Sequence, residues 1–243
     1  MPIIDAHMHL GPAQQRDWTR VEALSVERMI ALMDRYNIEK GFFSAAAGIM
    51  YRPEDGNELT WQAMCKYPDR VLGYINTNPH CGRRAVDEID KRCQQGFRGL
   101  KLGPVYNNYC LTDSFVFPVV EKAMELNLPI LIHIRHGDGD NLRGMMERYP
   151  RAKVIVAHLW EVEKRAQVVR DYDNVMWEIS GAGGGYRRVE EAVRLVGAEK
   201  LLFGSDLNIC YVASTLLPIQ KSFLTEKQKE LILYKNAKRY FGL

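Results

Sequence analysis

The segment 3–10, Ile-Ile-Asp-Ala-His-Met-His-Leu, carries two histidines one residue apart. Side chains of an extended strand alternate between two faces, so His7 and His9 are predicted to share a face with Asp5, and the apolar residues of the segment to share the other. Neutral imidazole is a common ligand for zinc and its first-row neighbours. Because an isolated pair can also be two hydrogen-bonded or solvated histidines, a metal site requires ligands from elsewhere.

Further polar side chains lie at the ends of other apolar runs. Lys101, His133, His158 and Asp206 each end or directly follow a run that the sequence predicts as a strand. Such positions favour burial with a partner, or metal ligation, over exposure to solvent. With the first pair, these positions account for four of the six histidines in the chain.

The elements that must position these residues alternate in type along the chain. Apolar runs are separated by stretches with apolar residues at helical spacing, and Thr225-Glu-Lys-Gln228 has the capping-box spacing that begins a helix. The stretches that predict helices are 26–33, 61–65, 86–93, 115–126, 142–149, 162–169 and 189–196. The predicted strands are 3–10, 41–47, 71–75, 97–102, 129–133, 154–158, 175–179 and 201–203.

Near-continuous apolar strands that alternate with amphipathic helices are typical of a parallel sheet covered by helices. Eight such units in 243 residues predict an α/β fold with a single closed (β/α)8 TIM barrel, formed by residues 1–243 as one domain. An open doubly wound sheet is the alternative. In a barrel all strands point the same way, so the polar strand ends would meet at the C-terminal rim.

Composition excludes several other classes of protein. Thirty-three Lys and Arg face 30 Asp and Glu, and this balance does not indicate a nucleic-acid or anionic membrane surface. No apolar run approaches the roughly 20 residues of a membrane span, and the start lacks a signal-peptide pattern, so we expect a cytoplasmic protein. The five cysteines include no Cys-x-x-Cys pair and are expected to be free thiols. The sequence is compatible with a homo-oligomer.

Five motifs occur in an order that is known from one superfamily. They are Asp-x-His-x-His at 5–9, Ile-His133, Ala-His158, Gly-Ser-Asp206 and the ending Asn-Ala-Lys-Arg-Tyr-Phe-Gly-Leu at 236–243. This set resembles the amidohydrolase superfamily over the whole chain, and it is most similar to the amidohydrolase-2 branch of metal-dependent hydrolases and decarboxylases.

The resemblance implies a metal site at the barrel rim. His7, His9, His133 and Asp206 would hold one divalent metal ion, most often zinc, with manganese and iron as alternatives. Three neutral imidazoles and one carboxylate would leave the ion a net positive charge, which lowers the pKa of a bound water toward about 7. His158 would lie beside that water as general base or electrostatic aid, and Asp206 could carry its proton to the leaving group.

Three further residues have open interpretations. In two-metal members of the superfamily a carbamylated lysine bridges the ions, and Lys101 lies at about that place. The rest of the pattern favours an unmodified Lys101 that binds a substrate carboxylate or pairs with Asp206. Arg135 is a second candidate for substrate binding, with surface charge as the alternative. Glu178 faces either the pocket or the helix layer, according to a strand phase that the sequence leaves open.

These features predict a metal-dependent hydrolase in which a metal-activated water attacks a small, carboxylate-bearing amide, ester or lactone. A non-oxidative decarboxylase on the same fold is the first alternative, and a metal-free barrel that only binds a ligand is the second. The expected partner is a small-molecule substrate.

Overall fold

Eight strands of the computed structural model form one sheet. The structure describes residues 1–11, 13–14, 20–21, 24–134, 137, 139–181 and 187–243. Each strand of the large sheet is parallel to the next, in the order β1 (Ile3–Leu10), β4 (Ile38–Ala45), β5 (Val71–Asn76), β6 (Gly99–Leu102), β7 (Ile130–Ile132), β8 (Val154–Val156), β9 (Val175–Glu178) and β10 (Leu201–Leu202). A separate antiparallel pair comprises β2 (Ala13–Gln14) and β3 (Arg20–Val21).

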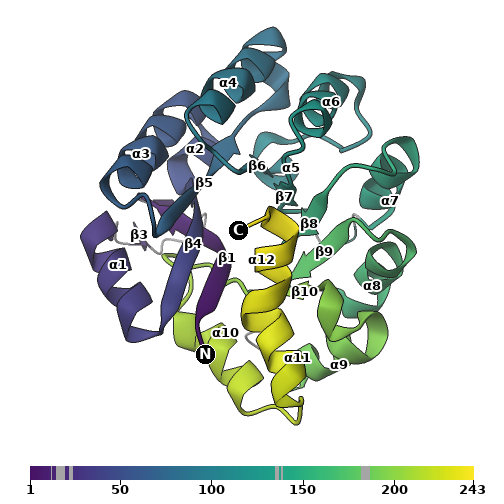
Figure 1. The fold of residues 1–243 in the computed structure, drawn as a ribbon. Helices are drawn as coiled ribbons and strands as arrows, with labels where there is room; N and C mark the ends of the chain where they lie inside the picture. The colour runs from purple at the N-terminus through teal and green to yellow at the C-terminus, as the bar shows by residue number, and fades with distance from the viewer. Residues whose placement is uncertain (12, 15–19, 22–23, 135–136, 138, 182–186) are drawn as a thin grey trace.

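Backbone hydrogen bonds join the two ends of this sheet. Ala6 N donates to Phe203 O over 2.9 Å, and Asp206 N donates to His7 O over 2.8 Å. Met8 also forms a parallel bridge with Leu207. The sheet therefore closes into a ring, which confirms the predicted (β/α)8 barrel and excludes the open doubly wound sheet (Figure 1).

Helices surround the ring of strands (Figure 1). The long ones are α1 (Val26–Arg35), α3 (Pro53–Lys66), α4 (Arg83–Gln94), α6 (Phe117–Glu125), α7 (Gly139–Arg148), α8 (Val162–Asp171), α9 (Arg188–Val196) and α10 (Val212–Gln220). The sequence patterns predicted all of these except α10. They also missed the short helices α2 (Ala46–Met50) and α5 (Pro104–Asn107), which contain too few residues to show a helical period.

The C-terminal segment closes the barrel at the end where the strands begin. The predicted capping box is present at Thr225, and α11 (Glu226–Glu230) continues through a π-helical turn (Leu231–Lys235) into α12 (Asn236–Phe241). The Phe241 ring stacks on Phe42 of β4 with centroids 3.8 Å apart. Figure 1 shows α12 and the C-terminus in front of the ring.

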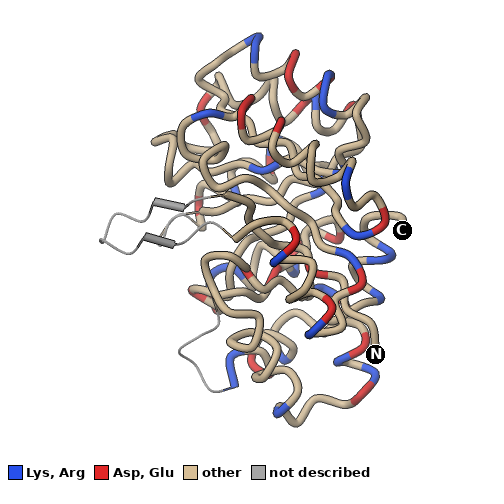
Figure 2. Tube along the Cα trace, turned by 90° about the vertical axis from the view of Figure 1, so that its left-hand side faces the viewer, with Lys and Arg blue, Asp and Glu red and all other residues tan. Residues whose placement is uncertain are grey.

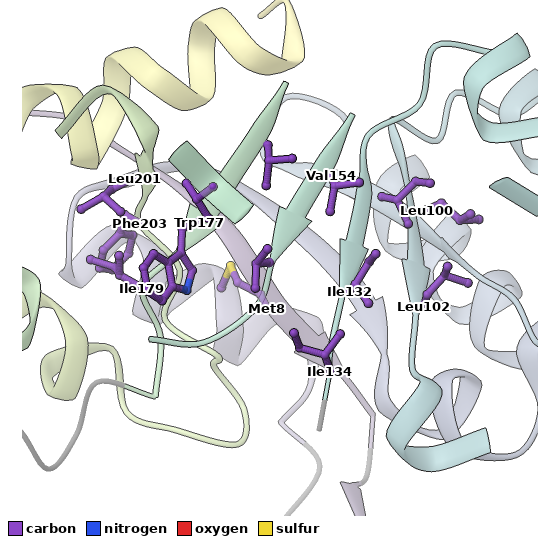
Figure 3. Close-up of a cluster of buried hydrophobic side chains, with 14 of the residues drawn as sticks. Met8, Leu100, Leu102, Ile132, Ile134, Val154, Trp177, Ile179, Leu201 and Phe203 are labelled. Carbon is purple, nitrogen blue, oxygen red and sulfur yellow. The ribbon is translucent and has the colours of Figure 1, made fainter. Parts of the chain in front are cut away.

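Strand side chains pack in two separate apolar clusters. The outer cluster lies between strands and helices, and Figure 3 shows its members Met8, Leu100, Leu102, Ile132, Ile134, Val154, Trp177, Ile179, Leu201 and Phe203. The inner cluster lies inside the ring and contains Ile4, Ala6, Phe42, Tyr74, Leu131, Ile155, Ala157, Met176, Leu202 and Ala237. Apart from β1, the strands therefore alternate side chains between the ring interior and the helix layer.

The strict alternation predicted for β1 is wrong. Ile4 and Ala6 belong to the inner cluster, whereas Met8 and Leu10 belong to the outer one. The pairing with β4 shifts register between Asp5 and Met8, which indicates a β-bulge. An extra residue in one strand turns the following side chains to the other face.

Charges are mixed over the surface. Figure 2 shows basic and acidic residues interspersed along the trace, in agreement with a net charge of +3. In the described residues no helix has the length and apolar character needed to cross a membrane. All five cysteines are free thiols, as expected.

Candidate metal centre

Three of the predicted ligands meet at the carboxyl ends of the strands. His9 Nε2 lies 3.0 Å from Asp206 Oδ1, and His7 Nε2 lies 3.7 Å from the same oxygen. Their ligand atoms are all within 4.8 Å of one another, and all three residues are buried. Asp206 follows β10, so the barrel brings it to β1 across about 200 residues of sequence.

The spacing of these atoms fits a shared metal ion. Two ligands about 2.1 Å from one ion at a tetrahedral angle are about 3.4 Å apart. The contact between His9 and Asp206 does not have hydrogen-bond geometry, and in the described part of the structure Asp206 Oδ1 is a buried oxygen with no hydrogen-bond partner. A buried carboxylate oxygen normally has a partner, so this donor set is chemically suited to a divalent cation.

Hydrogen bonds on the far side of each ring fix the imidazole tautomers. His9 Nδ1 lies 3.2 Å from Ser44 O, which can only accept, so His9 carries its hydrogen on Nδ1. His7 Nδ1 lies 2.8 Å from Glu178 Oε2. Both rings thus turn an Nε2 lone pair toward Asp206, which is the arrangement that metal-ligating histidines require.

Glu178 faces the site and not the helix layer. Its Oε2 accepts hydrogen bonds from His7 Nδ1, from His158 N over 3.2 Å and from the Ser180 hydroxyl over 2.9 Å, and its Oε1 accepts from Ser180 N. Burial raises the pKa of Glu178 to about 8, against the effect of the hydrogen bonds from Ser180 and His158 N. Gly204 on the neighbouring segment leaves the space that this carboxylate fills.

Lys101 reaches the same centre from β6. It is 1% exposed, and its Nζ lies 2.9 Å from His7 Nε2. Burial lowers the pKa of Lys101 to about 8, while the charges of Asp206 and Glu178 act in the opposite direction. The ammonium therefore stays mainly protonated at neutral pH and donates to His7. Burial, followed by the Lys101 charge, holds the pKa of His7 well below its usual value.

His158 is held by contacts on every side. Its Nδ1 lies 2.8 Å from Ser180 Oγ, its Nε2 lies 3.1 Å from His133 Nδ1, and Trp160 stacks on its ring with centroids 4.3 Å apart. Its φ of 65° is in the left-handed region, where a non-glycine residue costs about 1–3 kcal/mol. Burial keeps the pKa of His158 well below its usual value.

A second donor set, His7, His158 and Glu178, is also compact. However, the Glu178 oxygens already accept four hydrogen bonds, and His158 uses both ring nitrogens. Glu178 and His158 therefore act as hydrogen-bond partners that orient the ligands of the first set, and the second set is a poor metal site by itself.

The remaining predicted residues lie as follows. His133 follows β7 and contacts His158, and it belongs to neither compact donor set within the described residues. Arg135 lies outside the described residues. His80 lies away from the cluster, where it donates to Asn107 O and stacks on Phe115.

Sequence reasoning missed three neighbours of the site. Ser180 bonds His158 and Glu178. Cys210 Sγ contacts Asp206 Oδ2 at 3.7 Å, and the Tyr106 ring meets His133 edge to face at 5.0 Å. Burial raises the pKa of Cys210 to about 12 and that of Tyr106 to about 12. Ser180 could have been suspected from its place directly after a strand, but the other two lie in segments without a periodic pattern.

The sequence family agrees with this architecture. The amidohydrolase family matches residues 4–243, so the chain belongs to this family and the resemblance seen in the sequence is confirmed. No curated protein shows significant similarity to the chain.

Solved structures share the fold over its whole length. A 5-carboxyvanillate decarboxylase from Novosphingobium aromaticivorans, complexed with manganese and 4-hydroxy-3-methoxy-5-nitrobenzoic acid, has a TM-score of 0.81 at 16% identity over 100% of this chain and 96% of its own. A 2,6-dihydroxybenzoate decarboxylase from Rhizobium has a TM-score of 0.82 at 16% identity over 99% and 98%. A protein named as a probable 2-pyrone-4,6-dicarboxylic acid hydrolase from Acinetobacter baumannii, with citric acid bound, has a TM-score of 0.77 at 17% identity over 100% of both chains.

Proposed function

We propose that this protein is a metal-dependent enzyme that acts on a small carboxylate-bearing molecule, and that the reaction is non-oxidative decarboxylation. The proposed ligands are His7, His9, His133 and Asp206, around one divalent ion. Manganese is a candidate beside zinc, because the Novosphingobium decarboxylase of the same fold is complexed with manganese. When bound, such an ion supplies Lewis-acid polarisation of a substrate oxygen.

The observation that carries the substrate class is the environment of Lys101. This buried ammonium has no carboxylate oxygen within 4.0 Å in the described part of the chain, although a buried charge normally has a counterion. A carboxylate of the substrate would supply that counterion beside the metal ligands. The solved structures of the same fold support this proposal, because the proteins are named for the turnover of carboxylic acids.

Decarboxylation breaks the bond between a carbon and its carboxylate, and the electron pair that stays on the carbon must take up a proton. Asp206 is proposed to take that proton from solvent water and pass it to the carbon, because its Oδ1 faces the centre and has no hydrogen-bond partner among the described residues. Lys101 holds the substrate, and His158 acts through His133, since its ring nitrogens are both engaged.

Hydrolysis of a carboxylate-bearing ester or lactone is the second candidate. The full-length likeness to the Acinetobacter protein favours it, and the same Oδ1 of Asp206 can accept a proton from water. The two reactions differ in product, so a single assay separates them.

The test uses the full chain loaded with Mn²⁺ or Zn²⁺. The substrates are hydroxybenzoates labelled with ¹³C in the carboxylate, and carboxylate-bearing lactones and esters. Release of labelled CO2 that requires metal and is lost in Asp206→Ala supports the proposal, and surface Asp87→Ala is the matched control. Hydrolysis products without CO2 would establish the second candidate. A protein that retains less than about one-tenth equivalent of metal and is inactive with added metal would be a ligand-binding barrel.

A further inference from the structure

Ser180 contacts both His158 and the pair formed by His7 and Glu178. It directly follows Ile179 after β9, is 0% exposed, and its hydroxyl lies 2.8 Å from His158 Nδ1 and 2.9 Å from Glu178 Oε2. A longer contact of 3.5 Å reaches His7 Nδ1, which already bonds Glu178 at 2.8 Å. The hydroxyl thus lies at the centre of a connected hydrogen-bond chain.

The direction of this chain follows from counting hydrogens. The Ser180 hydroxyl has one hydrogen, which it donates to Glu178 Oε2 over 2.9 Å, the oxygen that also accepts from His7 Nδ1 and His158 N. The hydroxyl oxygen is then left to accept from His158 Nδ1. A neutral His158 then has no hydrogen on Nε2, so its contact at 3.1 Å requires a hydrogen on His133 Nδ1.

We propose that Ser180 is a positioning residue that sets the ring tautomer of His158 and, through it, that of His133. With its hydrogen on Nδ1, His133 presents the Nε2 lone pair, the form that a metal ligand needs. This inference deepens the proposed function and rests on His133 as the third imidazole ligand. Ser180 contacts His7 only at Nδ1, the ring nitrogen on the far side from Asp206, and it reaches the proposed ligand His133 only through His158.

The same hydrogen bonds in the opposite direction would give different ring tautomers, which can be distinguished by experiment. If the Ser180 hydroxyl donates to His158 Nδ1, then His158 carries its hydrogen on Nε2 and donates to His133 Nδ1. His133 would then have its hydrogen on Nε2, and that nitrogen could not bind a metal. The two arrangements place hydrogens on opposite nitrogens of both rings.

The ring tautomers can be read directly by long-range ¹H–¹⁵N NMR of the full chain, labelled with ¹⁵N and measured with Zn²⁺ and after chelation. His80 is an internal reference, because its Nε2 donates to Asn107 O away from the site. We expect Nδ1–H forms for His133 and His158 in the chelated protein. In Ser180→Ala the acceptor for His158 Nδ1–H is removed, so both rings should move to the Nε2–H form. Ser180→Thr keeps a hydroxyl and should keep the original tautomers, as should Ser214→Ala, which replaces an exposed serine of α10.

Zinc affinity gives the second measurement. Loss of an outer partner of a ligating histidine typically weakens metal binding about 10–100-fold. We expect that loss in Ser180→Ala, and a change below about threefold in Ser180→Thr and Ser214→Ala. Unchanged tautomers in Ser180→Ala would overturn the inference. If that variant does not fold, Nε2–H forms in the wild-type spectrum would overturn it as well. Because the spectra require no turnover, an inactive protein with the expected tautomers would contradict only the proposed reaction.

Discussion

His7 Nδ1 lies 2.8 Å from Glu178 Oε2, although 171 positions separate the two residues in the chain. Glu178 ends β9, and its carboxylate also bonds the backbone of His158 and both donors of Ser180. One buried carboxylate therefore links His7 of β1 to the segments that carry His158 and Ser180. Such partners fix ring orientation and raise the basicity of a metal ligand.

Replacement of Glu178 should weaken metal binding more strongly as more of its carboxylate oxygens, which accept hydrogen bonds, are removed. Glu178→Gln keeps one oxygen, but its NH2 group must face a donor on one side, so we expect about 1–3 kcal/mol loss of unfolding free energy and about tenfold weaker metal binding. Glu178→Ala should lose about 100-fold in affinity. Chelator competition and urea unfolding measure both quantities, with surface Glu226→Gln as control. Unchanged affinity in both variants would show that Glu178 does not orient a ligand.

Lys101→Met should separate substrate binding from metal binding. Lys101 Nζ lies 2.9 Å from His7 Nε2, the atom proposed to bind the metal, so the ammonium competes with the ion for one lone pair, and its removal should leave metal affinity equal or stronger. The KM for a carboxylate substrate should rise about 10–100-fold, because a hydrogen bond to a charged group is lost. Exposed Lys221→Met serves as control. Loss of metal in Lys101→Met would instead favour the bridging carbamate and two ions.

Gly204→Ala tests whether metal binding requires the space that Gly204 leaves for the Glu178 carboxylate. A methyl group on Gly204 would overlap the Glu178 carboxylate, so the side chain must move. We expect about 1–3 kcal/mol of destabilisation and at least tenfold weaker metal binding. At Gly139 the nearest atom to an added methyl group is Lys164 Cβ at 4.0 Å, so Gly139→Ala should be neutral or slightly stabilising. Equal behaviour of the two variants in chelator competition would refute the steric argument.

Phe241→Ala should affect stability and leave the metal site intact. Its half-buried ring stacks on Phe42 at the opposite end of the barrel from the ligands, so we expect a loss of about 2–4 kcal/mol in urea unfolding. The control is Phe223→Ala, whose side chain is 81% exposed and should contribute less than about 0.5 kcal/mol. A metal affinity that falls in Phe241→Ala but not in Phe223→Ala would show that the two ends of the barrel are coupled.

The sequence alone determined the repeating strand and helix pattern and the polar residues that end the strands. Apolar periodicity is a local property, because each strand must bury its own side chains, so eight units and a barrel followed from it. The capping box at Thr225 is equally local. His7, His9 and Asp206 stood out because polar side chains at the ends of apolar runs require a partner.

Only the tertiary structure decided how those residues face one another. The bulge in β1, which separates Ala6 from Met8, depends on pairing with β4. The direction of Glu178 depends on the phase of β9 within the closed ring. The tautomers of the histidines depend on partners that lie far away in sequence, such as Ser44 and Ser180. These features depend on contacts between segments that are distant in sequence, so they cannot be predicted from a local pattern of residues.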